Sequence, residues 1–99
     1  MTFEQFNDGK GLKITLDTKL TAVTAETLEN DLKTKLKGVE ELVIDMSKLA
    51  YVSSAGLRLL LKTQKTMELQ GKMTINNADP NVMSIFKTTG FDGVLNIQN

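Results

Sequence analysis

The stretch from Leu42 to Leu61, LVIDMSKLAYVSSAGLRLLL, holds the alternation of strand, turn and helix that decides the fold. Its apolar run 42–44 is continuous, which is typical of a central strand buried on both faces. Tyr51 and Val52 then predict a brief extended segment. A helix is expected to begin at the serine pair 53–54, because serine is among the best N-terminal capping residues.

The helix that follows this turn is predicted to be amphipathic. Its apolar and its basic side chains each recur at intervals of three or four residues, on different faces. The apolar ones are Leu57, Leu60, Leu61 and Met67, and the basic ones are Arg58, Lys62 and Lys65. We expect the helix to run to Leu69 or Gln70 and Gly71 to end it.

On the N-terminal side, the sequence predicts a hairpin and a helix. The segments TFEQFN (2–7) and GLKITLDT (11–18) alternate apolar and polar residues, as strands do. Between them, NDGKG is rich in residues that tolerate positive φ. The segment TAETLENDLKTKLKG (24–38) has helical spacing, with Thr24 as the expected N-cap and Gly38 as the expected stop.

On the C-terminal side, two strands flank a third helix. KMTIN (72–76) reads as a strand, and Asp79 followed by Pro80 predicts a helix over about 81–88 that Gly90 closes. GVLNI (93–97) is predicted to form a terminal strand. The whole order predicts a single α/β domain over residues 1–99, with a mixed, mostly parallel sheet, an N-terminal hairpin and three main helices.

The composition limits the possible functions. Twelve basic and twelve acidic residues cancel, so no long-range field favours nucleic acid. The chain has neither Cys nor His, which removes thiolate nucleophiles, imidazole bases and the usual metal ligands. No apolar run reaches the ~18–20 residues needed to span a bilayer, and the N-terminus lacks the order of a signal peptide. We expect a cytoplasmic protein that does not insert into membranes, has no cofactor and is not an enzyme.

The turn VSSAG admits a structural and a functional interpretation. In the first, its serines serve only to cap the helix. In the second, they form a site, since free N–H groups and the dipole of a helix start favour a negative group. Two catalytic interpretations fail. A nucleophile elbow around Ser54 requires glycine where Val52 stands, together with a histidine. A phosphate-binding loop requires more glycines and a following lysine.

Three other sets of residues are open to two interpretations. Asp45 and Ser47 could ligate Mg²⁺, although an aspartate after a strand more often accepts backbone N–H bonds from the next loop. The basic stripe on the second helix suits either an acidic partner or a solvated surface. Met67, Met73 and Met83 suit either the core or an exposed partner contact.

The central motif resembles the signature segment of STAS domains, and especially of the bacterial anti-sigma factor antagonists. That signature is a buried strand ending in D-x-S, an aromatic residue, D-S-x-G-L or a variant, and a leucine-rich helix. The resemblance extends to LDTKLTAVTAETLENDL near the first helix and to IFKTTGFDGVLNI at the C-terminal end. The motif serine falls on Ser54, and the usual aspartate falls on Ser53.

The resemblance implies a binding protein that is switched by phosphorylation. Such antagonists bind an ATP-dependent anti-sigma factor serine kinase and free a sigma factor; the kinase phosphorylates the serine and a PP2C-type phosphatase restores it. Ser54 is then the expected phosphoacceptor, with Ser53 as second choice. The expected partner contacts are Tyr51, Ser53, Ser54, Ala55, Gly56 and Arg58. The alternative is a STAS adaptor or accessory subunit of a signalling or membrane transport complex, without a sigma-factor role.

Overall fold

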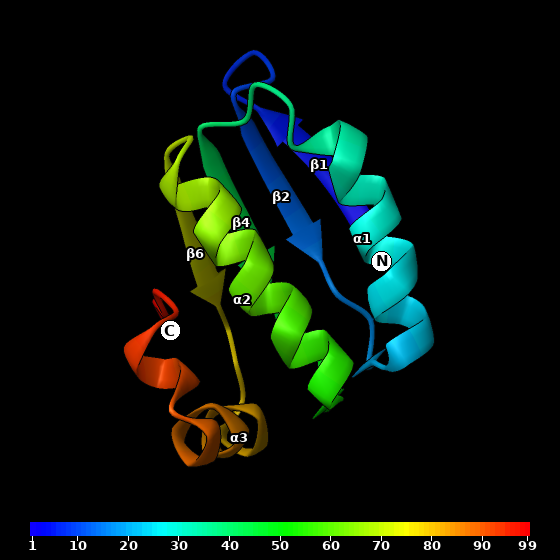
Figure 1. Cartoon of the computed structure of the whole chain (residues 1–99), viewed down its shortest axis with the longest axis vertical. Coiled ribbons are helices and arrows are strands. Elements are labelled where there is room, and N and C mark those ends of the chain that lie inside the picture. Colours follow the sequence, from blue (N-terminus) through cyan, green and yellow to red (C-terminus); the bar gives the residue numbers. More distant parts are fainter.

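A computed structural model describes all residues, 1–99, and is built on a four-stranded sheet in the order β1-β2-β4-β6 (Figure 1). The strands are β1 (Thr2–Phe6), β2 (Gly11–Thr15), β4 (Glu41–Asp45) and β6 (Lys72–Asn76). β1 is antiparallel to β2, whereas the pairs β2–β4 and β4–β6 are parallel. The predicted mixed, mostly parallel sheet is thus confirmed.

The predicted hairpin between β1 and β2 is also confirmed. Asn7, Asp8 and Gly9 all have positive φ, at 53°, 56° and 86°, and the N–H of Lys10 donates to the carbonyl of Asn7 at 3.1 Å. Asn, Asp and Gly are the residue types that adopt this conformation at least cost. The local chemistry of NDGK therefore sets the register of the first two strands.

Two helices cover one face of the sheet: α1 (Ala22–Lys35) and α2 (Ser54–Glu68) (Figure 1). The residues beneath them form two rows across the three parallel strands, and all six are at most 2% exposed. The rows are Leu12, Leu42 and Met73, and Ile14, Ile44 and Ile75. The helical spacing predicted for residues 24–38 is confirmed, and the apolar residues on the sheet side of α1 are the buried Ala25, Leu28 and Leu32.

The expectation that both faces of β4 are buried is wrong. Leu42 and Ile44 are buried, but the alternate residues Val43 and Asp45 are only half-buried. The cause is topological. Because β2, β4 and β6 are added to the sheet in one direction, right-handed crossovers place both connecting helices on the same face. The opposite face therefore has no helical cover (Figure 1).

A second sheet of two strands lies at the start of both long helices. β3 (Lys19–Leu20) pairs in parallel with β5 (Tyr51–Val52), so the predicted extended segment at 51–52 is confirmed, whereas β3 was not predicted. β3 leads directly into Thr21, the N-cap of α1, and β5 leads into Ser53, the N-cap of α2. The two helices consequently begin side by side.

The predicted ends of the first helix need correction. Its N-cap is Thr21 rather than Thr24, because β3 stops one residue earlier and the Thr21 hydroxyl accepts the N–H of Thr24 at 3.2 Å. Thr24 returns the interaction by accepting the N–H of Thr21 at 2.7 Å, which completes a capping box. The helix ends at Lys35, and Gly38, with φ of 77°, lies in the turn that follows.

The third helix, α3 (Pro80–Thr89), lies at one end of the sheet and agrees with prediction (Figure 1). The Asp79 carboxylate accepts the N–H of Val82 at 2.9 Å, and Gly90 ends the helix with φ of 79°. None of the helices is both long enough and apolar enough to cross a bilayer.

The predicted C-terminal strand is wrong. Residues 91–93 form a 3₁₀ turn, η1 (Phe91–Gly93), and the N–H of Leu95 bonds back to Phe91 at 2.8 Å. The N–H groups of Val94 and Leu95 are committed to this turn, and only a single parallel bridge, between Ile97 and Ile75, joins the segment to β6. Leu95 is still buried.

Candidate functional site

The turn between β5 and α2 holds the serine pair, and Ser53 has a structural role there. Its hydroxyl accepts the N–H of Gly56 at 3.0 Å, and its own N–H donates to the carbonyl of Leu20 in β3 at 2.9 Å. Ser53 is half-buried and has extended backbone angles, as an N-cap requires. The predicted serine cap is confirmed, and it is Ser53 that provides it.

Ser54 differs from its neighbour in every one of these respects. It is the first helical residue of α2, its side chain is exposed, and its hydroxyl has no hydrogen-bond partner within the protein. Removal or modification of that hydroxyl therefore breaks no hydrogen bond of the folded chain. The two adjacent serines are thus divided between one that holds the helix start and one that is free to meet a partner.

Gly56 is small because α2 approaches β3 closely at this point. A Cβ atom at Gly56 would lie 2.9 Å from Cγ of Leu20 and 3.0 Å from its carbonyl oxygen. The residue is buried, so it acts through packing and presents no side chain to a partner. The small residue at this position of the motif keeps the serine turn pressed against the β3–β5 sheet.

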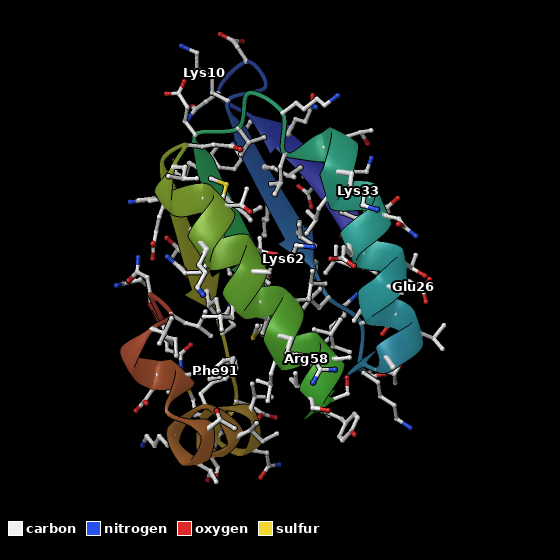
Figure 2. The ribbon with its side chains drawn as sticks, viewed as in Figure 1. Lys10, Glu26, Lys33, Arg58, Lys62 and Phe91 are labelled. Carbon is white, nitrogen blue, oxygen red and sulfur yellow. The ribbon has the colours of Figure 1, made fainter.

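The other predicted contact residues are divided between the surface and the interior. Tyr51 is 50% exposed and Arg58 is exposed without an ion pair, whereas Ala55 is half-buried. Figure 2 shows Arg58 near the start of α2, on the side that faces α1. Tyr51 and Arg58 are therefore accessible from the same end of the molecule as Ser54.

Sequence reasoning did not predict that the start of α1 lies at the same end of the molecule as Ser54. Val23, the second residue of α1, is 74% exposed, and a cleft of about 240 Å³ between the first turns of α1 and α2 includes Ala22, Ala55 and Arg58. The signal for Val23 was available, because it stands outside the helical stripe that buries Ala25. The cleft was not predictable without β3, which brings the two helix starts together.

Asp45 is a structural residue at the end of β4. Its Oδ1 accepts the N–H of Ser47 at 2.9 Å and the amide of Asn77 at 3.2 Å, while its Oδ2 lies 3.8 Å from Lys13 Nζ. Burial raises the pKa of Asp45, but the hydrogen bonds from Ser47 and Asn77 and the charge of Lys13 outweigh it and hold the pKa below its ordinary value. The carboxylate thus organises the loops after β4 and β6, as the backbone-bonding interpretation predicted.

No group of three or more Cys, His, Asp or Glu side chains is arranged to hold a metal ion. Among the methionines with two interpretations, Met67 and Met73 are buried and Met83 is half-buried against the core. The core interpretation is therefore confirmed for Met67 and Met73.

Comparison with known protein families and with proteins of known name gives results that agree with one another. The family profile described as the STAS domain matches residues 5–99. BtrV of Bordetella bronchiseptica, which is named as an anti-sigma factor antagonist, is 34% identical over 80 residues, covering 79% of this chain and 69% of BtrV.

Solved structures of SpoIIAA, also an anti-sigma factor antagonist, have the same fold. The unphosphorylated form superposes with a TM-score of 0.82 at 19% identity, covering 99% of this chain and 89% of that one. The phosphorylated form, from Bacillus, superposes with a TM-score of 0.74 at 18% identity, covering 99% and 92%.

Proposed function

The chain belongs to the STAS domain family and to the anti-sigma factor antagonists within it, and from this premise we propose that phosphorylation of Ser54 switches its binding to an anti-sigma factor. Unphosphorylated, it binds an ATP-dependent serine kinase that acts as anti-sigma factor, and so frees a sigma factor in the cytoplasm. A PP2C-type phosphatase reverses the modification. The chain acts as a binding protein and not as an enzyme.

The observation that carries this proposal is the exposed, unbonded hydroxyl of Ser54 beside the committed hydroxyl of Ser53. The Ser53 hydroxyl is half-buried and already accepts the N–H of Gly56, so it is less accessible to a kinase and a phosphate there would have to rearrange the existing cap. A phosphate on Ser54 displaces nothing and lies beside the free N–H groups of the first turn of α2, where a negative group is favoured. Ser54 is therefore the preferred acceptor and Ser53 the second choice.

The same position explains why a phosphate would weaken docking. It adds about −1.5 to −2 charges at the centre of the surface that Tyr51 and Arg58 border. A partner that docks on this surface would have to desolvate or oppose that charge, and each 1.4 kcal/mol of cost lowers affinity about tenfold. In this proposal the switch works by charge and desolvation, with little change in fold.

The test is calorimetric binding to the anti-sigma factor kinases of the source organism, combined with phosphosite mass spectrometry after incubation with kinase and ATP. We expect phosphate on Ser54, and Ser54→Asp should lower affinity about tenfold or more. Ser53→Asp is the matched control, because it adds the same charge one residue away and can still cap the helix. It should lower affinity less than Ser54→Asp does.

Two results would count against the switch: phosphate on neither serine, or unchanged affinity of the Ser54→Asp variant. Stable co-purification with transport components, with both serines unmodified, would instead support an adaptor or accessory subunit.

A further inference from the structure

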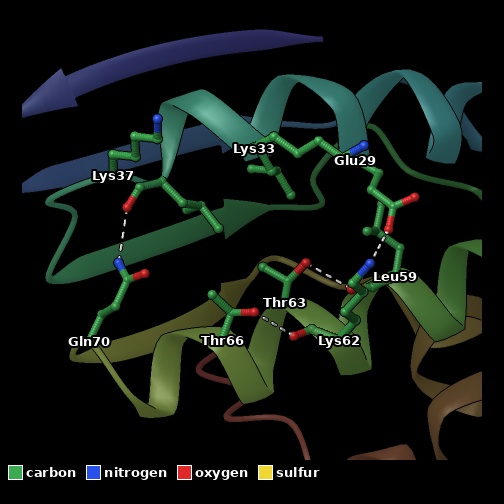
Figure 3. Close-up of a pocket in the computed structure, with 10 residues that line it drawn as sticks. Glu29, Lys33, Lys37, Leu59, Lys62, Thr63, Thr66 and Gln70 are labelled. Carbon is green, nitrogen blue, oxygen red and sulfur yellow. Dashed lines mark hydrogen bonds and ion pairs between the residues drawn. The ribbon is translucent and has the colours of Figure 1, made fainter.

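A groove runs between α1 and α2, beyond the serine turn, and its rim is basic (Figure 3). We call it the interhelical groove. It encloses about 220 Å³, and its lining residues are Glu29, Leu32, Lys33, Leu36, Lys37, Leu59, Lys62, Thr63, Thr66 and Gln70. Leu32, Leu36 and Leu59 retain between 7% and 8% exposure, so a partly accessible apolar surface lies within a polar rim.

Both ends of the interhelical groove are fixed by contacts between distant parts of the chain. At one end the Lys62 ammonium lies 2.6 Å from the Glu29 carboxylate, across the two helices. At the other end the Gln70 side chain donates to the carbonyls of Leu36 and Val39, at 2.9 and 2.8 Å. The groove is therefore preformed, and a ligand would not have to open it.

The positive charge of the rim is not neutralised within the chain. Neither Lys33 nor Lys37 takes part in an ion pair, and the only hydrogen bond of the Lys33 ammonium is a long one, 3.5 Å, to the neutral amide of Asn30. The charge of Lys62 is matched by Glu29. Two cations without an ion pair thus lie on the rim of the groove, in a chain whose net charge is zero. Figure 2 shows Lys33 and Lys62 on the face formed by α1 and α2.

The basic and apolar character continues onto the outer side of α2. A shallower hollow that shares Lys62 with the interhelical groove also includes Lys65 and Leu69. Leu69 is 90% exposed, the highest value of any large apolar side chain here, and Lys65 has no ion pair. An uncovered leucine beside the unpaired Lys65 suits a partner that is itself both apolar and acidic.

We propose that the interhelical groove docks an acidic amphipathic segment of a protein partner. An apolar side chain of the segment enters between Leu32, Leu36 and Leu59, and its flanking carboxylates pair with Lys33 and Lys37. The groove adjoins the cleft at the helix starts, with which it shares Glu29, Leu59 and Lys62, but Ser54 is not among its lining residues. The inference does not rest on the phosphorylation switch.

The dimensions of the groove favour this occupant over others. A volume of about 220 Å³ is below the ~300–1,000 Å³ of sites that enclose a small molecule, but it suits one apolar side chain. A membrane surface is nearly flat and would not reach a floor recessed between two helices. A segment with one apolar anchor and flanking acids uses both the floor and the rim, as anchor-in-groove complexes do.

The experiment is an NMR titration of the ¹⁵N-labelled full chain with a synthetic peptide of about 18 residues, long enough to form a helix. The peptide carries leucines at helical spacing and glutamates elsewhere. We expect the shift changes to concentrate at Leu32, Leu36, Leu59 and Thr63. The double variant Lys33→Glu/Lys37→Glu should bind the peptide at least about tenfold more weakly, because attraction becomes repulsion at two positions.

The matched control is Lys48→Glu/Lys87→Glu, which makes the same change of net charge at exposed sites away from the groove and should retain the wild-type affinity within about twofold. A Lys33→Gln/Lys37→Gln variant, checked for folding by circular dichroism, gives a second measure if the charge reversal fails to fold.

Four results would overturn the proposal. The first is shift changes scattered over the surface, and the second is equal affinity for a peptide with serine in place of leucine. The third is equal loss of affinity in the control variant. The fourth is binding to vesicles of anionic phospholipid with none to the peptide. Unchanged peptide affinity in Ser54→Asp would show that the groove and the proposed switch act separately.

Discussion

Replacing each serine of the turn by alanine should separate their roles. Ser53→Ala removes the hydroxyl that accepts the N–H of Gly56 at 3.0 Å, leaving the first turn of α2 without its side-chain cap. Loss of such a cap costs about 1 kcal/mol, within a range of roughly 0.5–2 kcal/mol. For a domain of this size, about 1 kcal/mol lowers the melting temperature by about 4–8 °C. Ser54→Ala removes no bond, and alanine is the better helix former, so stability should change by less than about 0.5 kcal/mol.

The measurement is urea unfolding followed by circular dichroism at 222 nm. The free energy of unfolding is compared with one common m-value, the slope of that free energy against urea concentration. Ser53→Asp serves as the control, because aspartate also caps helices and should recover most of the loss. Equal destabilisation by the two alanine variants would refute the division of roles between the serines. So would a Ser53→Ala variant as stable as the wild type.

Three further predictions concern the scaffold. Because the pKa of Asp45 is lowered on folding, its carboxylate stabilises the fold above about pH 4, and this contribution is lost as the pH falls through the lowered pKa. Asp45→Asn should thus be less stable than the wild type near pH 7 and converge with it in acid, as urea midpoints measured across pH would show. Gly71→Ala should lose about 1–3 kcal/mol or more in urea unfolding, because the new Cβ would overlap the Glu40 carbonyl; unchanged stability would contradict the packing. Phe86→Ala empties a site that is 0% exposed and should cost about 3–5 kcal/mol by the same assay, whereas a loss under about 1 kcal/mol would show that the site collapses.

The long periodic segments were predictable because their patterns are strong. The hairpin residues NDGK, the leucines of α2 and the pair Asp79–Pro80 each specify local geometry through short-range physics. β3 could not be predicted, because it has only two residues and exists through its pairing with β5. The N-cap of α1 was misplaced for the same reason: Thr21 and Thr24 are both plausible caps, and the end of β3 selects between them.

The site was predicted in part. The sequence placed Ser53 and Ser54 at a helix start, but it did not show which hydroxyl would be committed to the backbone. That depends on the pairing of β5, which fixes the position of Ser53 over the carbonyl of Leu20. The interhelical groove was beyond sequence reasoning, since it needs Glu29 and Lys62, 33 positions apart, to meet across two helices.

Because the β3–β5 ladder is short, the length of the connection 46–50 determines which residue stands at the start of α2 as much as its sequence does. Two residue pairs fix where the turn begins, with Leu20 opposite Val52. A deletion of one residue within 46–50 that the connection did not absorb would move every later side chain one place along the ladder, and the buried Val52 would change its partner. Ser54 would arrive at the capping position, and Ala55 would become the first helical residue, so that no exposed hydroxyl would remain there. Homologous chains that keep the serine pair but change the length of this connection should therefore have lost the modifiable position.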